Sequence, residues 1–347
     1  MKQTEKQHSN LLTLIYNLIN IDLQTKERLE YKDIRSYIDK ALSLTHIDCD
    51  EEDIAKLTYH IEYTYRITHT EGQCIFSDYE DRTNWYSNDS IKNPYFWSRY
   101  RQYLINNTSI DINSINLLDE VTLPNIMNCL GNPNDVFEGN RLRRGLIIGD
   151  VQSGKTATYS GLICKAADAG YKVVILLAGI TESLRQQTQE RIDEGIIGFT
   201  RKKVNKKDVN ERVGVGVHSQ ELLACSFTSC ANDFVGNCDK ISTSLESHNC
   251  VVLFVIKKNV SVLKRLYNWL NEMNYDTVKR CVDQPMLLID DEADNASVNT
   301  KKDETNPTRT NELIRKICNL FKNATYVGFT ATPFANVFID PDTDDKM

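Results

Sequence analysis

The sequence lacks any long apolar run. Its longest apolar stretches, VVILLAG at 173–179 and VVLFVI at 251–256, have the length of a strand. They fall far short of the roughly 20 residues that cross a membrane. The opening residues, MKQTEKQHSN, contain no apolar segment of the kind that a secretory signal peptide requires. We therefore expect a cytoplasmic protein that makes no contact with membranes.

Excess positive charge is missing as well. The formal net charge is −7 over 347 residues, which argues against a protein that binds nucleic acid over its whole surface. A local basic groove remains compatible with this charge. Hydrophobic residues make up 41% of the chain and charged residues 26%, as in ordinary globular proteins, so most of the chain should fold. The length suffices for two domains.

Closely spaced cysteine pairs are also absent. Several cysteines and histidines do gather in one segment: Cys225, Cys230, Cys238, Cys250, His218 and His248. No two of the cysteines have the C-x-x-C spacing that presents two thiolates to one zinc ion. We therefore favour free thiols over a metal site, and the missing secretory signal favours free thiols over disulfides.

The first part of the chain, residues 1 to about 135, has helical periodicity and no nucleotide motif. Apolar residues recur at i, i+3 and i+4 in LLTLIYNLINIDL at 11–23, DIRSYIDKALSL at 33–44 and DIAKLTYHIEYTYRI at 53–67. Asp33 and Asp53 are candidate caps for the second and third of these helices. We expect a mainly helical N-terminal domain that ends near residue 135.

One helical segment of this region, NPYFWSRYRQYL at 93–104, interleaves aromatic and basic residues. Such side chains can stack on nucleic-acid bases. Aromatic residues at helical spacing more often pack in a core, and we favour the core here.

From about 136 to 347 the pattern changes to strands alternating with helices. The predicted strands are GLIIG, KVVILLAG, VVLFVI, MLLID and TYVGFTA, and the predicted helices are KTATYSGLICKAADAG, TESLRQQTQERIDEG, VSVLKRLYNWLNEM and TNELIRKICNLF. This alternation predicts an α/β fold with a mostly parallel sheet and helices on both faces. Residues 200–250 are irregular and predict an insertion or long loops.

The segment GLIIGDVQSGKT at 145–156 matches the phosphate-binding pattern G-x-x-x-x-G-K-[ST] between a predicted strand and a predicted helix. In such a loop the backbone N–H groups surround the phosphates, and the helix dipole attracts them. Lys155 then neutralises the β- and γ-phosphates of ATP, and the Thr156 hydroxyl binds Mg²⁺. A plain glycine turn is the alternative. The predicted nucleotide-binding residues are Gly149, Asp150, Val151, Gln152, Ser153, Gly154, Lys155, Thr156 and Ala157.

A second candidate site is the acidic segment MLLIDDEADNAS at 286–297. An apolar strand that ends in carboxylates fits the acidic partner of a phosphate loop, where one Asp holds Mg²⁺ and a neighbouring Glu acts as the catalytic base. The hydrophobic run points to Asp290 as the magnesium ligand, whereas alignment on D-E-A-D points to Asp291. We prefer Asp291 with Glu292 as base, because only this choice leaves a glutamate next to the ligand. An acidic loop without chemistry is the alternative.

The third candidate site is the strand end TYVGFTATPF, which contains Thr330 and Thr332. Small hydroxyl residues at this place can hydrogen-bond the acidic cluster and transmit the nucleotide state to the rest of the molecule. T-A-T alone is a weak signal, and an ordinary strand end is the alternative. Its position in the strand after D-E-A-D gives it weight.

In this order, GKT, DEAD and TAT resemble motifs I, II and III of superfamily 2 helicases, whose first lobe has a RecA-like P-loop fold. The helix ITESLRQQTQERI at 180–192 resembles motif Ia, which contacts the nucleic-acid backbone in that superfamily. The resemblance therefore implies nucleic-acid contacts at Thr181, Ser183 and Arg185. Lys257 and Lys258 follow a strand at the edge where such folds bind ligands and are further candidates.

The flanking residues narrow the resemblance. RRGLIIGDVQSGKT, KAADAGYKVVILLAGITESLRQQTQERID, LLIDDEAD and TYVGFTATPFANVFID closely resemble the Z-one domain family of bacterial ATPases, which are described as endonucleases. The resemblance covers about residues 85–340. It implies an ATP-dependent remodeller of DNA in a restriction-like or anti-phage system. The sequence has no second carboxylate cluster that would support a nuclease.

Basic residues outside the motifs allow more than one interpretation. TRKKVNKKDVNER at 200–212 follows the motif Ia helix and can lie beside a phosphate backbone, although charged loops are more often only solvated. Arg141, Arg143 and Arg144 precede the first strand and fit either nucleotide contact or structural ion pairs.

Superfamily 2 motors use a second RecA-like lobe that supplies an arginine to the nucleotide. The sequence ends at Met347, shortly after the third motif, so we expect this lobe in a missing part of the protein or in a partner protein of a defence system. The competing hypothesis is an ATP-dependent switch that binds a protein and moves no nucleic acid.

Overall fold

The computed structural model describes residues 2–23, 29, 31–45, 47, 49–65, 84–149, 154–204, 207–217, 219, 221–234, 244–294 and 309–331. The chain divides into two compact units, Met1–Ile75 and Phe76–Met347. Among the described helices, none combines the length and the apolar character that would let it span a bilayer.

The first unit contains three helices, α1 (Lys2–Asp22), α2 (Tyr31–Thr45) and α3 (Glu51–Tyr65). They share a core of buried aliphatic side chains whose helical spacing the sequence predicted: Leu11, Ile15, Ile19, Ile34, Ile38, Leu57 and Ile61. The predicted caps are wrong. Asp33 and Asp53 lie within the first turns of their helices, and the side chain of Asp50 accepts the Asp53 N–H at 2.8 Å.

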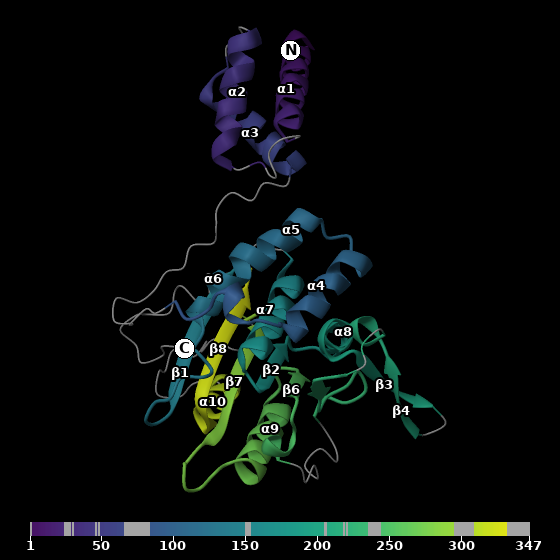
Figure 1. The fold of residues 1–347 in the computed structure, drawn as a ribbon, viewed down its shortest axis with the longest axis vertical. Coiled ribbons are helices and arrows are strands. Elements are labelled where there is room, and N and C mark those ends of the chain that lie inside the picture. Colours follow the sequence, from purple (N-terminus) through teal and green to yellow (C-terminus); the bar gives the residue numbers. More distant parts are fainter. Residues whose placement is uncertain are drawn as a thin grey trace. The chain divides into compact units, whose positions relative to one another are not determined.

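The second unit is built on a six-stranded sheet (Figure 1). Its order is β1 (Arg141–Ile148), β8 (Phe321–Thr330), β7 (Val282–Asp291), β2 (Val173–Ala178), β6 (Val251–Ile256) and β5 (Ala224–Ser226). Every pairing in this sheet is parallel. The predicted α/β fold with a mostly parallel sheet is confirmed. All strands therefore end at one edge, where ligands bind in open sheets of this kind.

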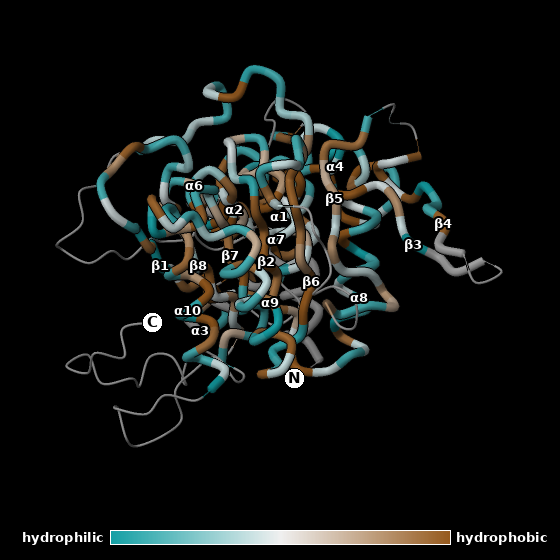
Figure 2. The backbone as a smooth tube through the Cα atoms, turned by 90° about the horizontal axis from the view of Figure 1, so that it is seen from below, coloured by the Kyte–Doolittle hydropathy of each residue, from teal (hydrophilic) through white to brown (hydrophobic). Residues whose placement is uncertain are grey.

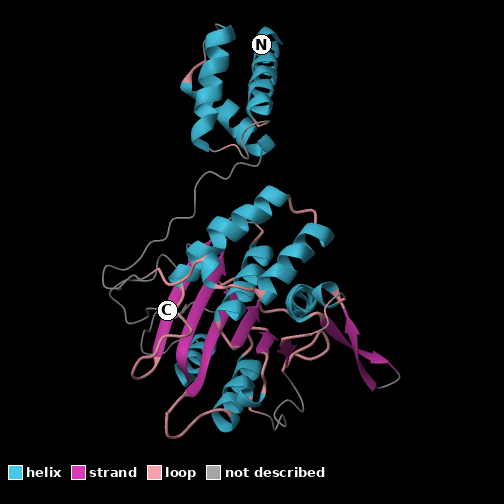
Figure 3. Ribbon diagram, in the orientation of Figure 1, coloured by secondary structure: helices cyan, strands magenta, loops and turns pink. Residues whose placement is uncertain are grey.

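Apolar side chains cover both faces of the sheet, and the central strands are accordingly hydrophobic along their length (Figure 2). Alternate residues of β2 point to opposite faces: Val174 and Leu176 belong to one core, and Val173 and Ile175 to the other. Helix α7 (Lys155–Ala169) packs in the first core, and α9 (Val260–Met273) and α10 (Arg309–Leu320) pack in the second (Figure 3). Helix α8 (Glu182–Ile192) follows β2.

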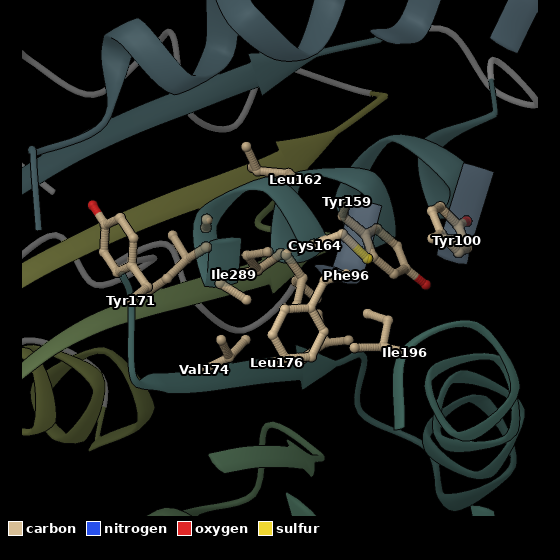
Figure 4. Packing of buried hydrophobic residues seen from close by; sticks show 14 of the residues in the cluster. Phe96, Tyr100, Tyr159, Leu162, Cys164, Tyr171, Val174, Leu176, Ile196 and Ile289 are labelled. Carbon is tan, nitrogen blue, oxygen red and sulfur yellow. The ribbon is translucent and has the colours of Figure 1, made fainter. Parts of the chain in front are cut away.

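Three further helices contribute to the core in which α7 packs: α4 (Tyr95–Asn107), α5 (Ile112–Leu117) and α6 (Leu123–Cys129). Phe96, Trp97 and Tyr100 of α4 are buried as expected, and Phe96 and Tyr100 lie in the same core as Tyr159 of α7 (Figure 4). The carboxylate of Asp168 accepts the N–H groups of Phe96 and Trp97, both at 2.9 Å, and so holds the start of α4.

The buried Lys165 of α7 connects this helix to the segments before it in the sequence. Its ammonium binds Asp119 and Asn88, each at 2.7 Å, and lies 4.8 Å from the ring centre of Trp97. These helices are therefore an integral part of the sheet unit. The domain boundary predicted near residue 135 therefore moves to between Ile75 and Phe76. Aromatic spacing in the sequence shows that α4 packs in a core, but it does not show whether that core belongs to the N-terminal helices or to the sheet.

The region 200–250, predicted to be irregular, contains regular structure. Strands β3 (Phe199–Val204) and β4 (Lys207–Arg212) form an antiparallel hairpin, which projects beside α8 (Figure 1). The basic segment 200–212 is this hairpin rather than a loop. Arg212 binds the carbonyls of Gly216 and Ser219 and so fixes the end of β4.

Candidate nucleotide-binding site

The predicted phosphate loop leaves the edge of the sheet after β1. The Gly149 N–H donates to the carbonyl of Thr330 at the end of β8, with an N···O distance of 3.0 Å. Residues Asp150, Val151, Gln152 and Ser153 lie outside the described part of the chain. Gly154 caps helix α7 with a left-handed backbone, φ 74°, which glycine adopts without strain. The loop therefore joins the end of a strand to the start of a helix, as the motif predicted.

The start of α7 has the properties of an anion site. It begins with Lys155, Thr156 and Ala157, which are half-buried, and its first turn contains no acidic residue. The positive end of the helix dipole is therefore not compensated by a carboxylate of its own helix. The backbone N–H groups of the first turn of α7, the helix dipole and the ammonium of Lys155 together suit a bound phosphate.

The predicted magnesium ligand Thr156 has a partner that the motif did not indicate. Arg191 of α8 is exposed, and its Nη1 donates to the Thr156 hydroxyl at 3.0 Å. This arginine adds a second positive charge beside the start of α7. No motif predicts this contact, because Arg191 lies in α8 and only the packing of α8 brings it to Thr156.

The two adjacent aspartates at the end of β7 have different environments. Asp290 is fully buried: its Oδ1 lies 2.8 Å from the ammonium of Lys258, and its Oδ2 accepts the Tyr326 hydroxyl at 2.8 Å. Both carboxylate oxygens of Asp290 are thus engaged within the protein. Burial, followed by the charge of Asp290, raises the pKa of Tyr326 well above its ordinary value, which keeps this phenol a proton donor.

Asp291 is half-buried at the edge of the sheet. Burial and then the neighbouring Glu292 raise the pKa of Asp291. A bound divalent cation would favour the charged carboxylate and reverse this effect. Asp291 therefore fits a magnesium ligand better than Asp290, and this agrees with the preferred register.

Glu292 adopts the left-handed region, φ 57°, which is rare for a residue with a side chain. Two hydrogen bonds hold the turn in which it lies. Lys258 donates from its ammonium to the Glu292 carbonyl, and the next residue, Ala293, donates its N–H to the Phe329 carbonyl at 2.9 Å. An outlier of this kind persists only where the surroundings enforce it, and such positions concentrate at functional sites.

The end of β8 contacts this acidic turn directly. The buried Thr330 donates from its hydroxyl to Oδ1 of Asp294 at 2.9 Å. Gly328 allows the close approach, since a Cβ at this position would lie 2.8 Å from that of Ala293. A contact between the third motif and the acidic segment therefore exists. The second predicted coupling residue, Thr332, lies outside the described residues.

The nucleic-acid candidates on α8 separate into two groups. Thr181 caps the helix by accepting the Leu184 N–H, and both Thr181 and Ser183 are exposed. Arg185 is fully buried, and its guanidinium binds Glu182 at 2.6 Å and the carbonyl of Cys230 at 2.9 Å. Assigning Arg185 to nucleic-acid contact is therefore wrong: its charge is used inside the protein.

The two lysines after β6 also have internal partners. Lys258 is buried against Asp290, so its assignment as a nucleic-acid contact is corrected in the same way. Lys257 is half-buried and binds Glu182 at 2.8 Å and Asp233 at 3.4 Å. Burial alone would raise the pKa of Glu182, but hydrogen bonds from Arg185 and Lys257 outweigh it and lower the pKa. This network fixes the start of α8 to the end of β6.

Arg141, Arg143 and Arg144 lie in the first half of β1, away from the edge at which the phosphate loop begins. Arg141 pairs with Asp135 at 3.4 Å, and Arg143 donates to the Leu130 carbonyl at 3.3 Å. These contacts favour the structural interpretation for Arg141 and Arg143.

Comparison with protein families shows to which family the chain belongs. The family model of the type III restriction enzyme res subunit matches residues 97–335, more than half of the chain. The chain belongs to this family. A search of the curated proteins found no match.

Membership of the res-subunit family makes the sheet unit a helicase-like P-loop ATPase lobe. The match includes the phosphate loop, the acidic turn and Thr330. It begins at Trp97 and so takes in most of α4 and all of α5 and α6, the helices that share a core with α7. The family as a whole uses ATP and Mg²⁺ and binds nucleic acid, and the arrangement around Lys155 and Asp291 is compatible with both ligands.

Proposed function

We propose that this chain is the ATPase lobe of a nucleic-acid translocase or remodeller in a bacterial restriction-like or anti-phage system, with DNA as its substrate. The family match supports the helicase-like ATPase, and the resemblance to Z-one domain proteins supports the defence setting. The observation that carries the proposal is at the end of β8, where the Thr330 carbonyl binds the start of the phosphate loop and its hydroxyl binds the acidic turn. One residue thus contacts both the start of the phosphate loop and the acidic turn.

In this proposal Lys155 and the N–H groups at the start of α7 hold the phosphates of ATP, and Thr156 and Asp291 hold the metal. Mg²⁺, when bound, neutralises charge on the β- and γ-phosphates. Glu292 accepts the proton of the attacking water. Asp290 pairs with Lys258 and holds its ammonium in place. Lys258 in turn binds the carbonyl of Glu292 and so fixes the backbone there.

Nucleic acid would contact the lobe beside α8. Thr181 and Ser183 are exposed at the start of this helix, and the basic hairpin β3–β4 follows its end. Hydroxyl groups and basic side chains are the usual ligands of phosphate oxygens. Each lysine of the hairpin that neutralises a phosphate would make binding more sensitive to salt. Arg212 is excluded from this role because it binds backbone carbonyls.

The alternative is a switch module that binds ATP and a protein partner without moving nucleic acid. The burial of Arg185 and Lys258 favours it, since this removes two of the basic contacts that the motor would use. The Thr330–Asp294 hydrogen bond serves either function, because it only relates the acidic turn to β8.

ATP turnover and DNA binding of the full chain distinguish the two functions. We expect DNA to stimulate turnover, and binding to weaken steeply with salt and in the variant Lys202→Glu/Lys203→Glu. The matched control Lys40→Glu/Lys264→Glu reverses the same number of charges on α2 and α9, which are not part of the hairpin, and should bind normally. If turnover is slow even with DNA, a second lobe or a partner that supplies an arginine should restore it. ATP-dependent association with a protein, without any DNA affinity, would refute the motor and support the switch.

A further inference from the structure

A cluster of sulfur and nitrogen ligands lies at the edge strand β5, on the opposite side of the sheet from β1 and the phosphate loop. Cys225 is the central residue of β5, the short edge strand, and Cys250 immediately precedes β6. His248 follows the single turn η6 (Leu245–Ser247). Because Ala224 of β5 pairs with Val251 of β6, the parallel pairing brings Cys225 beside the start of β6. The three residues are 25 positions or fewer apart and meet only through this pairing.

The ligand atoms of these residues have the spacing of a metal site. One ligand atom from each of Cys225, His248 and Cys250 lies within 4.8 Å of the others. The two Sγ atoms are 3.3 Å apart, and both cysteines are free thiols. Tetrahedral zinc with Zn–S bonds of about 2.3 Å places its sulfurs about 3.8 Å apart. Small side-chain movements therefore suffice to bring all three ligands to one ion.

The imidazole of His248 supplies a second, independent observation. Its Nε2 is buried and has no hydrogen-bond partner among the described residues. The ring packs edge-on against Phe227, with centroids 5.3 Å apart, and Phe227 in turn packs against Trp269 at 5.6 Å. A buried polar atom without a partner costs free energy, and a bound ion is one of its ordinary explanations. The aromatic residues hold the ring in place on one side.

We propose that Cys225, His248 and Cys250 bind one zinc ion, with the fourth position taken by water or another ligand. Two thiolates and an imidazole suit zinc, whereas magnesium prefers oxygen ligands. The ion would join the edge strand β5 to the start of β6, in addition to the backbone pairing of the two strands. Its position at the amino end of β6 separates it from the phosphate loop, so its effect is on stability and not on the chemistry of ATP.

The sequence groups these three residues in one segment but favours free thiols over a metal, because their pattern is C-x22-H-x-C. Neither the C-x-x-C pair nor the H-x₃₋₅-H pair of common zinc motifs is present. A single residue separates His248 from Cys250, and His248 has an extended backbone directly after η6.

Metal analysis of the full chain, purified under reducing conditions, tests the proposal. We expect about one zinc per chain by elemental analysis, and a thiolate-to-metal absorption band after replacement with Co²⁺. Cys225→Ser, Cys250→Ser and His248→Gln should each weaken zinc binding by about tenfold or more. The control Cys230→Ser removes a nearby half-buried thiol outside the cluster and should bind zinc like the unsubstituted chain.

Thermal unfolding provides a readout that does not depend on ATP. A chelator should lower the midpoint of the unsubstituted chain and of Cys230→Ser by several degrees, and leave the Cys225→Ser/Cys250→Ser variant unchanged. If that variant does not fold, titration of the unsubstituted chain against a chromogenic zinc chelator decides instead. Absence of competition would refute the proposal. So would a Cys225–Cys250 disulfide in the reduced preparation, found by mass spectrometry with no metal bound.

Discussion

The ammonium of Lys258 lies 2.8 Å from Oδ1 of Asp290, and both side chains are completely buried. The same ammonium binds the carbonyl of Glu292, the residue that follows Asp290 and Asp291. A buried ion pair of this kind positions a backbone segment, and its geometry assigns the two adjacent aspartates to different tasks.

Asparagine substitutions should separate these tasks. Asp290→Asn leaves Lys258 buried without its counter-ion, so we expect a loss of about 3 kcal/mol or more in unfolding free energy, measured in urea. Asp291→Asn should fold normally and require a much higher Mg²⁺ concentration for ATP turnover. Lys258→Met together with Asp290→Asn should recover part of the stability. A normal fold for Asp290→Asn combined with lost magnesium dependence would show that the magnesium ligand is Asp290.

Lys155 and Glu292 should affect binding and turnover differently. Lys155→Ala removes the charge beside the phosphates and should abolish ATP binding, measured by calorimetry. Glu292→Gln keeps the side-chain shape and removes the base, so ATP should still bind while turnover falls by about a hundredfold or more. Lys172→Ala, an exposed lysine between α7 and β2, is the control. Unchanged ATP affinity in Lys155→Ala would mean that the loop does not bind phosphate.

Arg191 should contribute to nucleotide affinity, because its guanidinium lies 3.0 Å from the Thr156 hydroxyl. Arg191→Gln removes the charge at nearly the same length. We expect ATP affinity to fall several-fold while stability stays unchanged, since the side chain is exposed. Glu190→Gln changes the adjacent exposed residue and serves as the control. Equal affinity of Arg191→Gln and the unsubstituted chain would exclude this contribution.

Thr330 should couple nucleotide state to nucleic acid through its bond to Asp294. Thr330→Val preserves the shape and removes the hydroxyl, whereas Thr330→Ser keeps it. We expect the valine variant to retain basal ATP turnover and lose most of its stimulation by DNA, and the serine variant to behave normally. Equal stimulation of both variants would leave the hydrogen bond with a purely structural role.

Asp193 should make stability depend on pH. Burial raises the pKa of Asp193 from 3.8 to about 6 in the folded chain. The folded state therefore retains a proton that the unfolded state loses, so this group's contribution to stability falls as pH rises from 3.8 to about 6. Asp193→Asn lacks this decline and should gain on the order of 2 kcal/mol relative to the unsubstituted chain between pH 4 and pH 7, measured in urea.

The exposed Asp89→Asn is the control for this comparison, because it makes the same substitution at the surface of the protein. Parallel stability curves for Asp193→Asn and the unsubstituted chain would contradict the prediction. Asn at position 193 can still accept the hydrogen bond that Gln189 donates at 2.7 Å, so its packing is preserved.

Local patterns predicted the sheet well because its strands are short apolar runs between glycine-ended helices. The segment VVILLAG became β2 and VVLFVI became β6 without loss, since both are buried along their whole length. The hairpin β3–β4 was missed because its residues are mostly charged and its pairing is independent of any core pattern.

The roles of individual charged residues were harder to predict, because they depend on partners that are distant in sequence. Nothing near Asp290 indicates that Tyr326 and Lys258 occupy its two oxygens. Arg185 was read as a nucleic-acid contact from its motif, whereas Glu182 and the carbonyls of 229 and 230 bind its guanidinium in the interior. Burial of a charge is a tertiary property, and helical position alone does not reveal it.

The last two residues of β8, Phe329 and Thr330, link the free energies of two separate motifs. Their carbonyls bind Ala293 in the acidic turn and Gly149 at the start of the phosphate loop. A ligand that changes the free energy of the loop therefore also changes that of the turn, and by linkage the reverse effect has the same size. Substitutions at Gly149 and Asp294 should then be non-additive in a double-mutant cycle, although the two residues belong to different motifs. Loop and turn would respond to ATP as one cooperative element.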